Sequence, residues 1–269
     1  MDTYAPLIYV DGSDRKIVGD PRVPSLTARV TTLESASPGS STSGTSPALL
    51  AVQGILDRAD VQPVQIYVGG SSTALGGAST GTKRFADRLL ASLQKAHPSG
   101  GAETAVQYSS WTTDTGNGVH MYNYATSGSS AASYSAASRI VARSAQIAIH
   151  MIGSNDLLAG TTAGEYETIM RNMLAACDST VTFPVVHVLG HHGPRLIWAD
   201  STWDTYRDAL ARIAADRPDD TVLVDAGATF QVMRRNGDTS GYDADGVHMN
   251  DAGNATLGGI FARAFLAST

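Results

Sequence analysis

The chain has 269 residues, of which 42% are hydrophobic and 16% charged, so it can bury one substantial core. Its formal net charge is -6 and no basic run is dense enough to neutralise successive phosphates, so we expect no nucleic-acid partner. No apolar run approaches the roughly 20 residues of a membrane helix, and the first ten residues lack the basic-then-apolar order of a signal peptide. We therefore expect a soluble protein with no membrane span, either cytoplasmic or carried on a particle such as a virion.

The N-terminal part carries a weak structural pattern. A turn signal at Asp11-Gly12 separates two short apolar runs, and Leu26, Val30 and Leu33 then follow at helical spacing. We expect residues 1–34 to form a hairpin and a short helix that serve attachment or oligomerisation. The Ser/Gly/Thr-rich residues 35–46 offer almost nothing to bury and predict a flexible linker. The main domain is then 47–269.

Downstream, apolar strand-like runs alternate with amphipathic helical stretches, a pattern typical of a parallel sheet covered on both faces. Five strands are predicted, at residues 64–68, 119–123, 146–152, 184–189 and 221–224. The helices between them are marked by apolar spacing around residues 85–93, 166–174 and 203–213, and a last helix begins near Asp251. Because active-site residues gather at the carboxyl ends of such strands, the segments after each strand are where chemistry is expected.

The first of these segments is a glycine turn, Gly69-Gly70-Ser71-Ser72, which can hold the Ser71 hydroxyl at the edge of the sheet. Alone it is equally typical of a phosphate-binding loop or of an ordinary turn. The next strands are followed by Asn123 to Gly128 and by Gly153-Ser154-Asn155-Asp156. Gly128 allows close backbone approach to a ligand, and Asn155 offers an amide donor. A turn and local backbone capping are the alternatives for these two segments.

Near the C-terminus, Asp245-Gly246-Val247-His248 places a carboxylate three residues before an imidazole. Such an Asp can fix the His tautomer and leave its other nitrogen to take a proton from a serine. The alternative is a helix cap at Asn250 and Asp251 with incidental neighbours.

Other reactive side chains are assigned no chemistry. The single cysteine, Cys177, excludes an intrachain disulfide and lies among apolar residues, so we expect an inert helix position. His187, His191 and His192 cluster around the fourth strand, but adjacent histidines tend to point apart, so we expect no metal site and no cofactor. We expect the loop from His191 to Arg195 to line the cleft, with Trp198 and Trp203 adding apolar or sugar-stacking surface.

Taken together, the four segments resemble the sequence blocks of the SGNH (GDSL-type) hydrolase superfamily, over roughly residues 64–267. The Gly-x-Asn-Asp block at Gly153 to Asp156 and the Asp-x-x-His block at Asp245 to His248 are intact. The first block has Gly70 where the acidic residue before the nucleophile is usual, and the second has Ala125 in place of a common glycine.

The resemblance implies an α/β fold: a three-layer αβα sandwich around a five-stranded parallel sheet, of flavodoxin-like type. It implies Ser71 as nucleophile, His248 as general base and Asp245 as its orienting acid. The oxyanion hole would be formed by Ser71, Gly128 and Asn155.

The implied function is hydrolysis of a carboxylic ester, with a small acyl group such as acetyl on a carbohydrate or surface polymer as the expected substrate. The alternative is a catalytically degenerate binding or structural module of a particle. The N-terminal segment weakly resembles the attachment regions of bacteriophage tail proteins, which would place the chain on a virion.

Overall fold

The computed structural model describes residues 46–98, 106–107 and 116–267. The hairpin and helix expected within residues 1–34, and all but the last residue of the linker 35–46, lie outside the described residues. None of the described helices has both the length and the apolarity needed to cross a membrane.

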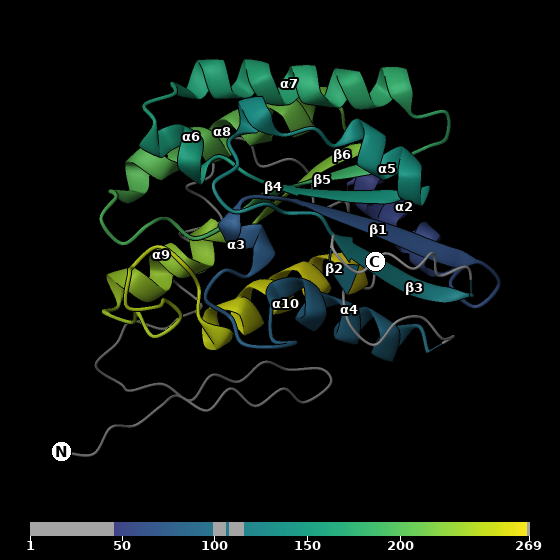
Figure 1. Ribbon diagram of the computed structural model, residues 1–269, viewed down its shortest axis with the longest axis horizontal. Coiled ribbons are helices and arrows are strands. Elements are labelled where there is room, and N and C mark those ends of the chain that lie inside the picture. The colour runs from purple at the N-terminus through teal and green to yellow at the C-terminus, as the bar shows by residue number, and fades with distance from the viewer. Residues whose placement is uncertain (1–45, 99–105, 108–115, 268–269) are drawn as a thin grey trace. The chain divides into compact units, whose positions relative to one another are not determined.

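One parallel sheet forms the centre of the described chain (Figure 1). Its strands are β1 (Pro63–Gly70), β2 (Val106–Gln107), β3 (Gly118–Asn123), β4 (Ile147–Met151), β5 (Val186–His191) and β6 (Thr221–Asp225). All five predicted strands are present. The edge strand β2 was not predicted, because two residues carry no periodic pattern.

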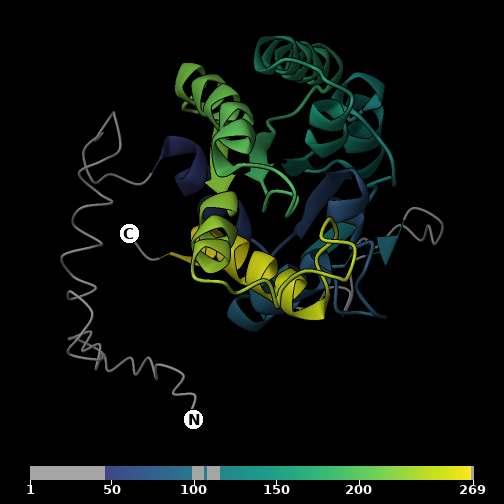
Figure 2. The ribbon, with the colours of Figure 1, turned by 90° about the vertical axis from the view of Figure 1, so that its left-hand side faces the viewer.

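Helices cover both faces of the sheet, as the end-on view in Figure 2 shows. The first face is covered by α2 (Pro47–Leu56), α4 (Phe85–Ala96) and α10 (Asp251–Leu266), and the second by α5 (Ala137–Arg143), α7 (Ala163–Thr180) and α8 (Asp200–Asp216). Along β1, Val64, Ile66 and Val68 pack into the first apolar layer, while Tyr67 packs into the second. Strands buried on both sides explain the nearly continuous apolar runs in the sequence and confirm the three-layer αβα sandwich.

The strand order β2-β3-β1-β4-β5-β6 determines where a site can form. Without the short edge strand, the order is that of flavodoxin-like sheets. The chain passes from β1 to β3 on one side and then crosses to β4 on the other, so the segments after these three strands meet at one edge of the sheet. Short elements follow there: α3 (Ser72–Leu75) after β1, the 3-10 helix η1 (Ala131–Ser133) after β3, and α6 (Ser154–Leu158) after β4. The last short helix, α9 (Gly227–Arg235), follows β6.

Candidate active site

The serine that contacts His248 is Ser72, one residue beyond the predicted nucleophile. The Oγ of Ser72 lies 2.9 Å from Nε2 of His248. Ser71 is 1% exposed, and its Oγ has no hydrogen-bond partner. The expectation that Ser71 faces the histidine is therefore corrected to Ser72.

The backbone at the end of β1 explains this register. Gly70 has φ +148°, and a Cβ there would lie 1.9 Å from the carbonyl oxygen of Met151, so only glycine fits. Ser71 is still extended and precedes the helix, whereas Ser72 is the first residue of α3. The first sequence block, a glycine followed two residues later by the serine that faces the histidine, is thus Gly70-Ser71-Ser72. Ser71, rather than Gly70, stands where the family's acidic residue is usual.

Asp245 and His248 form the expected pair. Nδ1 of His248 lies 2.6 Å from Oδ2 of Asp245, while Oδ1 of Asp245 accepts the N–H groups of Val247 and His248 at 2.8 and 2.9 Å. Partial burial raises the pKa of Asp245, but these backbone and ring hydrogen bonds outweigh it and lower the pKa to about 2. Because an ionised carboxylate only accepts, Nδ1 carries the imidazole proton and Nε2 is left to accept from the Ser72 hydroxyl.

The helix-cap alternative for this region also holds, alongside the pair. The Asn250 side chain accepts the N–H groups of Ala252 and Gly253 and caps α10. Asp251 at the start of α10 accepts hydrogen bonds from Thr80 N–H at 2.8 Å and from Lys83 Nζ at 3.1 Å. The Asp251 carboxylate therefore links the loop after α3 to α10, the helix that follows His248. It was not predicted, because its partners lie about 170 residues away in the sequence and leave no local pattern.

Two backbone N–H groups in the segments after β1 and β3 are candidate oxyanion donors, but the Ser71 N–H is not one of them. It donates to the Met151 carbonyl at 3.3 Å, so the expected role of Ser71 in the oxyanion hole is also corrected. Within the described part of the chain, the N–H groups of Ser72 and Gly128 have no acceptor. Gly128 has φ +79°, and a Cβ there would meet no atom within 4 Å, so its backbone borders open space. The turn that carries it is joined to β1 by Thr126 N–H donating to the Gly70 carbonyl at 3.0 Å.

Asn155 is held at both ends of its side-chain amide. Nδ2 donates to the Ser129 carbonyl at 2.9 Å, which brings the predicted third block against the second. Oδ1 accepts from Nη2 of Arg195 at 3.0 Å. Asn123, in contrast, is fully buried. Its side-chain amide donates to the Ala74 carbonyl in α3 and accepts from the Ala125 N–H, so it links α3 to the segment after β3.

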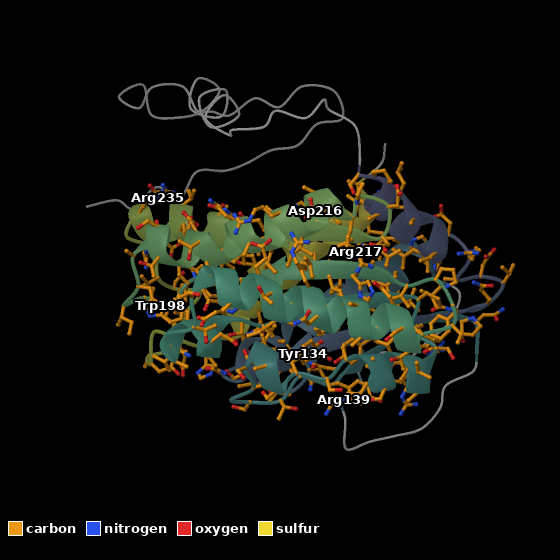
Figure 3. All side chains as sticks on the ribbon, turned by 90° about the horizontal axis from the view of Figure 1, so that it is seen from above. Tyr134, Arg139, Trp198, Asp216, Arg217 and Arg235 are labelled. Carbon is orange, nitrogen blue, oxygen red and sulfur yellow. The ribbon has the colours of Figure 1, made fainter. Side chains whose placement is uncertain are left out.

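The histidines around β5 do not converge on one point. His187 bonds His150 at 3.0 Å, whereas His191 bonds Asp225 at 2.9 Å and stacks on Trp203. Trp203 is 1% exposed, so the expectation that it adds cleft surface was wrong: it fills the core. Trp198 is partly exposed and lies at one end of the molecule, as does Arg235 (Figure 3). From the same loop, Arg195 reaches the Asn155 amide.

Comparisons with known proteins identify the family of the chain. The model of the GDSL-like lipase/acylhydrolase family matches residues 67–256. No curated relative matches the sequence. Neither the family match nor the structural likenesses given below support the phage-tail resemblance of the N-terminal segment.

Among solved structures, a catalytic mutant of the acetylxylan esterase Axe2 from Geobacillus stearothermophilus aligns with TM-score 0.57 and 18% identity, covering 77% of this chain and 95% of that one. A GDSL-family lipolytic protein from Veillonella parvula aligns with TM-score 0.56 and 14% identity, over 76% and 97% of the chains. A two-domain esterase active on acetylated mannans aligns with TM-score 0.61 and 16% identity, over 79% of this chain and 52% of that one.

These likenesses show the fold. The family match spans the segment that contains Ser72, Asn155 and His248. The chain belongs to the GDSL-like lipase/acylhydrolase family and is a GDSL-type ester hydrolase.

Proposed function

We propose that this protein hydrolyses a carboxylic ester with Ser72 as nucleophile, His248 as general base and Asp245 as the acid that orients it. The observation that carries the proposal is the unbroken chain from Ser72 Oγ through both ring nitrogens of His248 to Asp245, at 2.9 and 2.6 Å. Both distances are within hydrogen-bond reach, which is the geometric requirement for activating a serine.

The chemistry follows from this order. As Ser72 Oγ attacks the carbonyl carbon, its proton passes to Nε2 of His248, and the imidazolium that forms is stabilised by Asp245. Collapse of the tetrahedral intermediate expels the alcohol, which takes the proton from Nε2 and leaves an acyl-Ser72 ester. Water, deprotonated by the same Nε2, then attacks the acyl-enzyme; the bond to Oγ breaks, Nε2 returns the proton to Ser72 Oγ, and the carboxylic acid is released.

We assign the oxyanion donors to the N–H groups of Ser72 and Gly128 and to the Asn155 amide. Negative charge develops on the carbonyl oxygen in the transition state, and donors fixed beforehand stabilise it without reorganisation. The two backbone groups have no acceptor within the described chain, which supports the assignment.

For the substrate, we propose a small acyl group such as acetyl on a carbohydrate. Two observations support it. Two structural neighbours are esterases of acetylated polysaccharides, according to their names. On the loop after β5, the partly exposed residue Trp198 and Ile197, which is 81% exposed, provide apolar surface on which a sugar face can stack.

Turnover of p-nitrophenyl esters of increasing acyl length, together with acetate release from acetylated xylo- and manno-oligosaccharides, tests this function. We expect the acetate ester to be preferred. Ser72→Ala should abolish turnover, whereas Ser71→Ala, the matched control next to it, should retain it, because the Ser71 hydroxyl makes no hydrogen bond. A folded wild-type protein that turns over no ester would instead indicate the degenerate binding module.

A further inference from the structure

The side chain of Arg195 joins two parts of the site that the sequence blocks leave separate. It comes from the loop after β5 and donates from Nη2 to Oδ1 of Asn155 at 3.0 Å and from Nε to Oγ of Ser154 at 3.0 Å. The next residue on this loop, Leu196, donates its N–H to the Gly246 carbonyl at 2.8 Å, within the Asp245–His248 turn. The loop thus contacts both the proposed oxyanion amide and the turn that carries the proposed base.

The hydrogen bonds determine which way the Asn155 amide faces. Arginine can only donate and a carbonyl oxygen can only accept, so Oδ1 must face Arg195 and Nδ2 must face Ser129. One hydrogen of Nδ2 is used by the Ser129 carbonyl. The second has no acceptor within the described chain and is held in a fixed direction by the two bonds.

The guanidinium is itself restrained. It lies over the Trp198 ring, with Cζ 5.1 Å from the ring centre. The backbone of its loop is held by Arg234 of α9, whose Nη1 donates to the Trp198 carbonyl at 2.7 Å and whose Nη2 pairs with Asp200. Two hydrogen bonds and a ring contact therefore place the Arg195 charge before any substrate arrives.

We propose that Arg195 is a positioning residue that orients and polarises the Asn155 amide for oxyanion stabilisation. This inference rests on the proposed function. A cation bound to the amide oxygen draws electron density from the nitrogen and strengthens the remaining N–H as a donor. Arg195 acts on the reaction through Asn155 and exchanges no proton with the substrate.

A double-mutant cycle in kcat separates this role from a structural one. Arg195→Ala should lower kcat by about tenfold, less than the roughly 10²–10³-fold from loss of the amide itself, because the donor remains but is less well aligned. In the Asn155→Ala background, the same change should leave kcat nearly unaltered. Arg195→Lys, which keeps the charge but loses the planar fork, should recover only part of the loss.

The matched control is Arg207→Ala on α8, where the arginine pairs with Asp204 and Asp208. We expect its kcat to equal that of the wild type. Equal kcat losses from Arg195→Ala in both backgrounds would overturn the proposal and indicate general loosening of the loop. A rise in KM with unchanged kcat would also overturn it, indicating direct substrate binding. If the wild-type chain hydrolyses no ester, the proposed function fails first; an active wild type without coupling refutes only the role of Arg195.

Discussion

At the residue scale, Asp245 is proposed to act by fixing the position of one proton. It holds the proton on Nδ1 of His248, and without that bond the ring can turn or adopt the other tautomer. Asp245→Asn should therefore lower kcat by roughly 10⁴-fold, as in other serine hydrolase triads, and change KM little. Steady-state kinetics on p-nitrophenyl acetate measure both constants. A kcat within a few-fold of wild type would mean that His248 is oriented by another group.

Asn155 offers a second test at this scale, since its amide is proposed to meet the charge that develops on the substrate oxygen. Asn155→Ala should lower kcat by about 10²–10³-fold, as expected for one preorganised donor. The thermal midpoint should fall only slightly, because the side chain bridges two surface loops and fills no core space. If unfolding, followed by circular dichroism, showed a large loss of stability at unchanged kcat, Asn155 would be a structural residue only.

Single residues also show where sequence reasoning reaches its limit. The pairing of Asp245 with His248 could be predicted because the two are three residues apart. The choice between Ser71 and Ser72 could not, because it depends on the φ of Gly70 and on how closely the Met151 carbonyl approaches it. The loop holding Arg195 was expected at the cleft, but its bond to Asn155, 40 residues away, leaves no pattern in the sequence.

At the element scale, the five long strands and four long helices follow from hydrophobic periodicity, since each buries a full face or stripe. Shorter elements such as β2, α3 and α6 were not predicted. They are too short to show a hydrophobic periodicity in the sequence. They depend on contacts with neighbouring elements for their stability.

A buried polar chain crosses the second face of the sheet. Tyr134 contacts Nδ1 of His150 at 3.0 Å, and Nε2 of His150 contacts Nδ1 of His187 at 3.0 Å. Burial, with a smaller effect of Arg217, lowers the pKa of His187 to about 4, and burial also lowers that of His150 well below its ordinary value. Both rings are therefore neutral in the folded protein at neutral pH.

The two buried, neutral histidines predict how the stability of the protein depends on pH. Below about pH 6.5 these histidines bind protons in the unfolded protein but remain neutral in the folded protein. The free energy of unfolding should therefore fall as the pH drops from about 6.5 towards 4. One such group contributes at most about 1.4 kcal/mol per pH unit. His187→Gln should make this slope shallower in urea titrations at successive pH values. The same slope in variant and wild type would show that His187 is protonated in the folded state as readily as in the unfolded one.

At the scale of the whole molecule, the site residues and the core of the main domain are contained in residues 46–267. Its first helix, α2, already buries Ala48, Val52 and Leu56. We therefore expect a chain beginning at Ser46 to fold and to keep the kcat of the full chain, as assay of both on the same ester will show. Loss of folding in the shorter chain would show that the preceding residues belong to the catalytic domain.

The segment before Ser46 is proposed to mediate self-association or attachment to a larger particle. The sequence places Leu26, Val30 and Leu33 at helical spacing, and a helix this short would need a partner to be stable. Light scattering should give an oligomeric mass for the full chain and a monomeric mass for the chain beginning at Ser46. Monomeric masses for both would refute self-association.

Covalent labelling can identify the nucleophile of this esterase, which we propose is Ser72. An organophosphonate reacts only with a serine that a base has activated. Trypsin cleavage after Arg58 and Lys83 gives one peptide that contains both Ser71 and Ser72, and fragment-ion mass spectrometry can distinguish them. We predict a single label on Ser72, retained in Ser71→Ala and lost in Ser72→Ala and in His248→Ala. A label on Ser71, or none on the folded wild-type protein, would show that Ser72 is not the nucleophile.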